Sequence, residues 1–193
     1  MEIPPSFKPL TTYIRRAEEL DKDASNTSSM TVSYYCRLYA IDKGMKLGLP
    51  QSEMGFLLTV MSSAEELAKQ NPAVKSESGK TICQDFALQV FSNADDEDRG
   101  VGSTMATAKS FYAASAFFDV LEQFGELEPD IIEKRRYSKW KAADIVKALK
   151  EGRKPTAGGI GDEALTSSGG VSDIPAAPVT IPGVPPPYSQ PGV

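Results

Sequence analysis

The residue types available for chemistry are unusually restricted, because the chain of 193 residues contains no histidine. This absence removes the commonest general base and metal ligand, together with the Ser–His and Cys–His pairs that activate nucleophiles. Gly79-Lys80-Thr81 resembles the end of a phosphate-binding loop, but that motif needs a glycine where Val74 stands. We therefore expect a helix start at this position, no enzymatic activity and no cofactor.

A run of acidic residues, Asp95-Asp96-Glu97-Asp98, is the second candidate for chemistry. It lacks the alternating ligands and the glycine of a calcium-binding loop. Contiguous acids at a helix end are typical of a solvated face, so we expect one here and predict no metal site.

Binding is a stronger candidate than catalysis, and one candidate surface is a basic stretch around Trp140. It is either a solvated helix face or a patch for an acidic peptide or anionic lipid. Tyr112, on the neighbouring predicted helix, favours the peptide, because aromatic and arginine side chains dominate peptide-binding energy. The basic residues are Lys134, Arg135, Arg136, Lys139 and Lys141.

Two further motifs point to protein partners. Leu57, Leu58 and Met61 are either core residues or, in part, the lining of a groove that accepts an amphipathic helix. Pro185-Pro186-Pro187-Tyr188 matches the Pro-Pro-x-Tyr ligand of WW domains, which makes Pro185, Pro186 and Tyr188 candidate contacts. Such a match also arises by chance in a proline-rich segment.

Helical periodicity positions these motifs on six segments, about residues 6–21, 29–47, 51–70, 81–97, 103–124 and 129–151. The second and fifth segments are apolar on two sides and must be covered on two sides. The order of one-sided, two-sided and one-sided segments occurs twice and predicts an all-α fold of two three-helix bundles, residues 1–72 and 73–152. The apolar positions expected on the sixth helix are Ile132, Trp140, Ala143, Val146 and Leu149.

Composition and charge are consistent with a protein of the cytosol. The formal net charge is -5, which gives no overall basic field to attract nucleic acid. We expect no signal peptide and no transmembrane segment, and we expect Cys36 and Cys83 to be buried thiols. Residues 153–193 are rich in Pro, Gly, Ser and Thr, and predict a disordered linker or tail.

Five stretches, in order along the chain, resemble the Vps-twenty-associated family, also called the LYST-interacting protein five family. The first is VSYYCRLYA at residues 32–40, and the resemblance covers about residues 7–155. The other four are NADDEDR at 93–99, KSFYAAS at 109–115, FGEL at 124–127 and KRRYSKWKA at 134–142.

The resemblance implies tandem MIT modules that bind C-terminal helices of ESCRT-III subunits. It also implies a cofactor of the AAA ATPase that disassembles ESCRT-III during multivesicular body formation, recruited peripherally to endosomal membranes. In the family, ATPase stimulation and dimerisation belong to a C-terminal domain. The chain ends at Val193 without such a domain, so we expect binding to ESCRT-III but neither dimerisation nor ATPase activation.

The same resemblance assigns two surfaces. Met61, with Leu57 and Leu58, would line the groove of the first module. Tyr112 and Arg136, with Lys139 nearby, would meet an acidic ESCRT-III segment. The alternative function is a peripheral protein that binds anionic membranes through its basic sixth helix.

Overall fold

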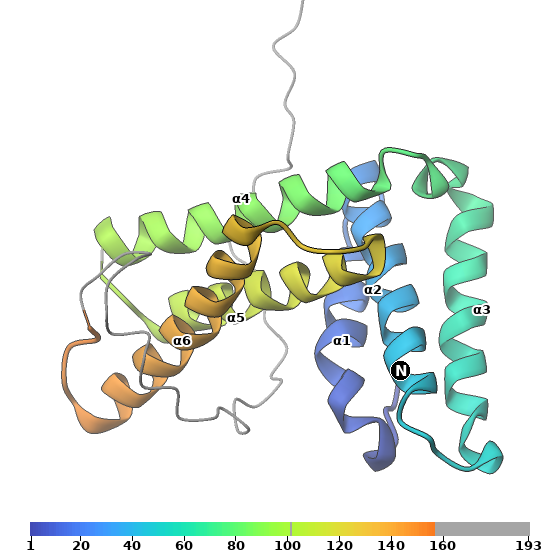
Figure 1. Cartoon of the computed structure of the whole chain (residues 1–193), viewed down its shortest axis with the longest axis horizontal. Helices are drawn as coiled ribbons and strands as arrows, with labels where there is room; N and C mark the ends of the chain where they lie inside the picture. The colour runs from blue at the N-terminus through green and yellow to red at the C-terminus, as the bar shows by residue number, and fades with distance from the viewer. Residues whose placement is uncertain (101, 157–193) are drawn as a thin grey trace, which may run out of the picture. The chain divides into compact units, whose positions relative to one another are not determined.

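The computed structural model describes residues 1–100 and 102–156, and this part of the chain is helical with no strand. The predicted all-α fold with six helical segments is confirmed (Figure 1). The α-helices are α1 Thr11–Leu20, α2 Thr27–Met45, α3 Gly55–Gln70, α4 Gly79–Gly100, α5 Met105–Val120 and α6 Pro129–Glu151. Four short 3-10 helices flank them: η1 Pro5–Leu10, η2 Gln51–Glu53, η3 Pro72–Lys75 and η4 Leu121–Phe124.

Local sequence signals explain where these helices begin and end. The Asn26 side chain accepts hydrogen bonds from the backbone N–H groups of Ser28 and Ser29 at 3.0 and 3.2 Å, and so caps α2. Thr104 caps α5 in the same way. Gly152 ends α6 with a left-handed φ of 67°, which a residue without a Cβ adopts at little cost.

The first compact unit, Met1–Cys83, is built around α2. This helix packs against both α1 and α3, which lie on either side of it in Figure 1, as its two-sided pattern predicts. Buried apolar side chains of η1 and the three helices form one cluster. It contains Phe7, Leu10, Ile14, Ala40, Leu57 and Val60.

The first unit continues past α3 into the start of α4. Val74 of η3 is completely buried and packs beside Met30 and Leu67. At Gly79 an added Cβ would lie 2.4 Å from the Tyr35 hydroxyl, so α4 begins in close contact with α2. The boundary between the two modules at residues 72 and 73 therefore remains a prediction. The first compact unit extends further, to Cys83.

Both cysteines are buried and free, as predicted. Burial raises the pKa of the Cys36 thiol to about 12 and also raises the pKa of Cys83 well above its usual range. Because the thiolate is the reactive form, these thiols serve as apolar packing residues.

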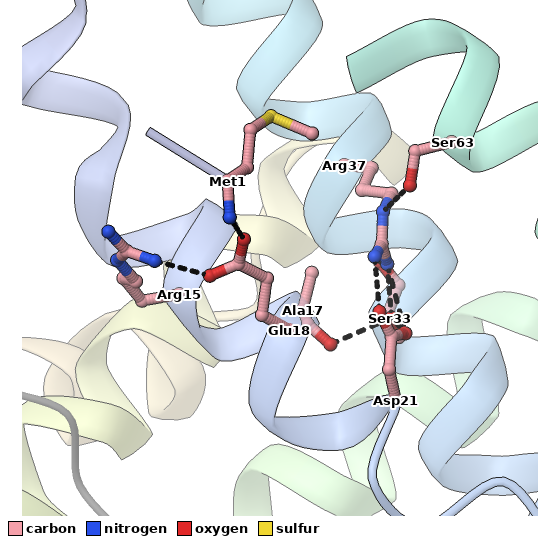
Figure 2. A network of polar contacts seen from close by, with 8 residues as sticks. All are labelled: Met1, Arg15, Ala17, Glu18, Asp21, Ser33, Arg37 and Ser63. Atoms are coloured by element: carbon pink, nitrogen blue, oxygen red, sulfur yellow. Dashed lines mark hydrogen bonds and ion pairs between the residues drawn. The ribbon is translucent and has the colours of Figure 1, made fainter. Parts of the chain in front are cut away.

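A polar network centred on Arg37 links the three helices of the first unit (Figure 2). Arg37 of α2 is buried and donates a hydrogen bond from Nε to Ser63 Oγ of α3 at 2.9 Å. Its guanidinium also forms an ion pair with Asp21, which follows α1, and contacts Ser33 Oγ. Ser33 Oγ lies 2.6 Å from Asp21 Oδ1, so the network satisfies the polar groups that it buries.

Gly44 supplies a test of the packing between α2 and its neighbours. A Cβ added there would lie 2.6 Å from Leu57 Cδ2 and 3.0 Å from Leu10 Cδ1. We expect Gly44→Ala to lower the free energy of unfolding by about 1–2 kcal/mol, because overpacking forces buried side chains from their rotamers. Chemical denaturation followed by circular dichroism measures this loss.

Gly55→Ala is the matched control for Gly44→Ala. Gly55 is also helical, and a Cβ there would meet nothing within 4 Å. We expect this variant to be neutral or slightly stabilising, because alanine reduces the entropy of the unfolded chain. Equal destabilisation by the two changes would show that the loss at residue 44 does not come from the contact with Leu57, because alanine itself favours a helix over glycine.

The second compact unit takes the described residues from Gln84 onward. Helix α5 packs along α6, and aromatic side chains join α4 to both. The rings of Phe86 and Phe117 lie 5.0 Å apart, and Phe91 lies 6.1 Å from Tyr137. The apolar residues that recur at helical spacing along α4 are all buried, namely Cys83, Phe86, Ala87, Val90, Phe91 and Ala94.

The predicted apolar positions of the sixth helix are wrong. Ile132 and Leu149 are exposed, and Trp140 is half-buried. The buried face of α6 carries polar residues among its apolar ones, which hides its periodicity in the sequence. That face consists of Ile131, Tyr137, Ser138, Lys141, Ala142, Ile145 and Ala148.

Candidate functional site

The predicted contacts of the first unit divide between its core and its surface. Leu57 is only 5% exposed and packs in the core with Phe7 and Leu10. Leu58 is 56% exposed and Met61 is 40% exposed. The structure therefore places Leu58 and Met61 at the surface of α3 but turns Leu57 inward, so the three do not form one lining.

The exposed residues of α3 form a stripe on one side of the helix. Leu58 and Met61 are three residues apart, a spacing that places side chains together on a helix surface. Half-buried Met54 precedes Leu58 by four residues, and exposed Glu65 follows Met61 by four. An apolar stripe bounded by a carboxylate is a surface that an amphipathic helix can cover.

The predicted contacts of the second unit lie on two helices. Tyr112 is half-buried on α5, and Arg136 is exposed on α6. Among the described residues no ion pair engages Arg136. Lys139 Nζ instead lies 2.9 Å from Asp119 Oδ1 of α5, so its charge is already partly neutralised.

Two further residues of the basic stretch, Arg135 and Lys134, are also paired within the second unit. Arg135 Nη1 lies 2.6 Å from Glu122 Oε1 and 3.3 Å from Asp119 Oδ1. Lys134 Nζ lies 3.3 Å from Asp130 Oδ2. These pairs reduce the positive field of the basic stretch at residues 134–141, in which Arg136 is the exposed cation that has no ion pair among the described residues.

Lys141 is not a surface residue. Its side chain is 1% exposed, and its Nζ lies 2.7 Å from Oδ2 of Asp98, whose side chain is 7% exposed. The interpretation of residues 95–98 as a solvated face is therefore wrong for Asp98, which enters the unit to pair with Lys141. Asp95 pairs with Arg99 of its own helix at 2.8 Å.

The sequence interpretation overlooked Asp119, which neutralises two basic residues of α6. It is the only charged residue in the apolar run of residues 113–121. A lone carboxylate in such a run must find a cation or a hydrogen-bond donor when the helix is buried. This signal, read together with the basic stretch, identifies Asp119 as its partner.

Three further predictions concern the WW-ligand motif, metal binding and a membrane-spanning segment. The candidate WW-ligand residues Pro185, Pro186 and Tyr188 lie outside the described residues. In residues 1–100 and 102–156 no cluster of carboxylates and thiols is arranged to hold a metal ion. No helix in the same part of the chain has the length and apolar composition needed to span a bilayer.

Sequence comparison adds an independent line of observation. The chain is 44% identical over 167 residues to the Arabidopsis thaliana protein homolog of mammalian LYST-interacting protein 5, covering 83% of this chain and 38% of the relative. It is 40% identical over 166 residues to the vacuolar protein sorting-associated protein VTA1 homolog of Bos taurus, covering 83% and 52%.

The VTA1 homolog of Pongo abelii is 37% identical over 186 residues, covering 91% of this chain and 59% of that relative. The chain thus spans about half the length of these curated relatives. The match to the Vta1-like family covers residues 9–151, which include all six α-helices. This chain therefore belongs to the Vta1-like family.

Proposed function

We propose that this protein is a non-enzymatic adaptor of vacuolar and multivesicular-body sorting that binds C-terminal helical segments of ESCRT-III subunits. Membership of the Vta1-like family supports the sorting role, since several relatives are named for vacuolar protein sorting. The observation that carries the binding role is the exposed pair Leu58 and Met61 on α3. Apolar side chains at this spacing are the usual receptor for an amphipathic helix.

The two bundles would act as tandem MIT modules, near residues 1–72 and 73–152. In the first, Met61 and Leu58 would contact the partner helix, while Leu57 would support them from the core. The protein would also be part of a cofactor of the AAA ATPase that disassembles ESCRT-III, acting from the cytoplasm at endosomal membranes. A WW-domain partner for the segment around Tyr188 belongs to the same proposal.

In the second module, Arg136 and Tyr112 would meet an acidic segment of an ESCRT-III subunit. The ion pairs of Lys134, Arg135 and Lys139 favour this partner over an anionic membrane. Membrane attachment depends on several unpaired cations acting together. Within the basic stretch of residues 134–141, one exposed arginine is better suited to a single peptide contact.

Titration with ESCRT-III C-terminal peptides, followed by NMR shifts of the whole chain, tests this function. Shifts around Met61, or around Tyr112 and Arg136, would support the adaptor and assign each peptide to a module. Vesicles with and without anionic lipid provide the competing measurement. Salt-sensitive vesicle binding without any peptide shift would replace the adaptor with the membrane function.

We expect Met61→Asp to weaken peptide binding to the first module by about thirtyfold or more, which corresponds to ~2 kcal/mol. The introduced carboxylate would have to be desolvated against the apolar face of the partner helix. Isothermal titration calorimetry measures the loss.

Met105→Asp is the matched control, because Met105 is 43% exposed, comparable to Met61, but lies on α5. This change should leave binding to the first module unaltered. Equal affinities for the unaltered protein and Met61→Asp would remove the α3 stripe from the proposed site.

A further inference from the structure

The chain that follows α6 is held by two side chains of that helix. The backbone N–H of Thr156 donates a hydrogen bond to Asp144 Oδ2 at 2.6 Å. The backbone carbonyl of the same residue accepts one from Lys141 Nζ at 2.8 Å. Both main-chain groups of Thr156 are thus bound by charged side chains, and hydrogen bonds of this kind are the stronger ones in proteins.

These contacts require the chain to turn back along α6. The chain reverses at Gly152, and the N–H of Arg153 donates to the carbonyl of Ala148 at 3.0 Å. On α6, Asp144 lies eight residues before Gly152, a distance of about 12 Å along the helix axis. Four extended residues span about 13 Å, so the segment from Gly152 to Thr156 is just long enough to return to Asp144.

A second contact reinforces the position of this segment. Arg153 Nη2 lies 2.9 Å from Asp144 Oδ1, so one carboxylate holds both the start and the end of the segment. Burial raises the pKa of Asp144, but hydrogen bonds from Thr156 and Arg153 outweigh it and lower the pKa overall. Asp144 is therefore ionised at neutral pH, the state that accepts these hydrogen bonds.

The segment ends at the buried ion pair of the second unit. Lys141 is bound on one side by Asp98 and on another by the carbonyl of Thr156. Asp98 also accepts a hydrogen bond from Ser103 Oγ, in the connection after α4. An ammonium group has three N–H donors, and an ion pair as dry as this one is stable only when its remaining groups are also satisfied.

We propose that residues 153–156 form a strap, latched to α6 by Asp144, that closes over the Lys141–Asp98 ion pair and keeps water from it. The strap also sets where the following chain leaves the second unit. That point lies beside Lys141 and Asp144, about two turns back from the end of α6. Any segment or domain joined downstream is tethered there. This inference does not depend on the proposed binding of helical peptides.

Hydrogen exchange in the full chain, measured by NMR, tests the strap. In Asp144→Ala we expect exchange of the Thr156 amide to become about tenfold faster or more, the factor that one charge-assisted hydrogen bond supports. Exchange of the Lys141 ammonium hydrogens should accelerate in the same variant, because water gains access to the ion pair. Arg153→Ala should produce a smaller acceleration at both positions, since the Asp144–Thr156 bond remains.

Lys147→Gln is the matched control, because Lys147 is an exposed residue of α6 within one turn of Asp144. It should leave both exchange rates unchanged. The strap is disproved if the Thr156 amide of the unaltered chain exchanges as fast as in a free peptide. It is equally disproved if Asp144→Ala accelerates Thr156 but leaves the Lys141 ammonium unchanged, since the segment would then not cover the ion pair.

Discussion

Replacing Lys141 with methionine is expected to lower the free energy of unfolding of the second unit by about 3–5 kcal/mol. The change leaves the carboxylate of Asp98 without its cation in a position where the side chain is only 7% exposed. Ser103 supplies one remaining donor, which is insufficient to compensate a buried negative charge. Trp140, the single tryptophan, lies on α6, so its fluorescence during denaturation reports on this unit.

A double variant separates the charge effect from the loss of packing. Lys141→Met combined with Asp98→Leu removes both charges, and replacing a buried ion pair by apolar residues is often neutral. We therefore expect the double variant to recover most of the stability lost in Lys141→Met. A double variant as unstable as the single one would show that the cost comes from packing or from the contact with Thr156.

The second large effect is expected in the first unit, where Arg37→Met should lower the free energy of unfolding by about 3 kcal/mol. Arg37 donates charged hydrogen bonds to groups around α1, α2 and α3, and each such bond contributes about 1.5–3 kcal/mol. The total is smaller than a simple sum because Asp21 is 35% exposed and regains water when the guanidinium is lost. Native-state hydrogen exchange of the α2 amides measures the change.

Arg15→Met is the control for Arg37→Met, and Figure 2 shows both arginines. Arg15 also forms an ion pair, with Glu18 at 2.7 Å, but it lies at the surface of α1. Exposed pairs of this kind contribute about 0–1 kcal/mol, so we expect little change. If both arginine variants destabilise the unit equally, burial is not what makes Arg37 important.

The two large effects have one physical basis. Each residue carries a charge into the interior of its helical bundle, and each charge is acceptable only because its partner comes from outside its own helix. Lys141 should have the larger effect because its partner is also buried. Arg37 leaves behind a carboxylate that water can reach. Comparing Lys141→Met with Arg37→Met therefore measures how much of the lost free energy of unfolding comes from the carboxylate that is left without its cation.

Much of the fold followed from the amino-acid sequence by itself. Helical periodicity located six helices, and a helix start was correctly expected within Gly79-Lys80-Thr81, although periodicity placed the segment from about residue 81. The two-sided pattern of residues 29–47 identified α2 as a helix packed on both sides. These features are local, because they depend on residue spacing within one helix and on turn residues next to it. For the same reason the family could be identified from short ordered stretches.

The candidate site depended more on tertiary structure. Leu57 and Leu58 are adjacent and equally apolar, and the sequence alone did not show which one faces the core. The packing of Leu57 against Leu10 and Phe7, far away in the sequence, decides it. In the same way, the basic stretch of α6 predicts a charged surface until Asp119 and Glu122 are brought beside it by the packing of α5.

Helix α6 shows most clearly what only the tertiary structure decided. Its buried face includes Lys141 and Ser138, so a search for apolar periodicity selected the neighbouring exposed face with Ile132 and Leu149. Lys141 is buried because Asp98, on α4, lies close enough to neutralise it. Residue spacing determines which side chains share a helix face. The free energy of burying a charge depends on a partner that only the folded chain brings into contact.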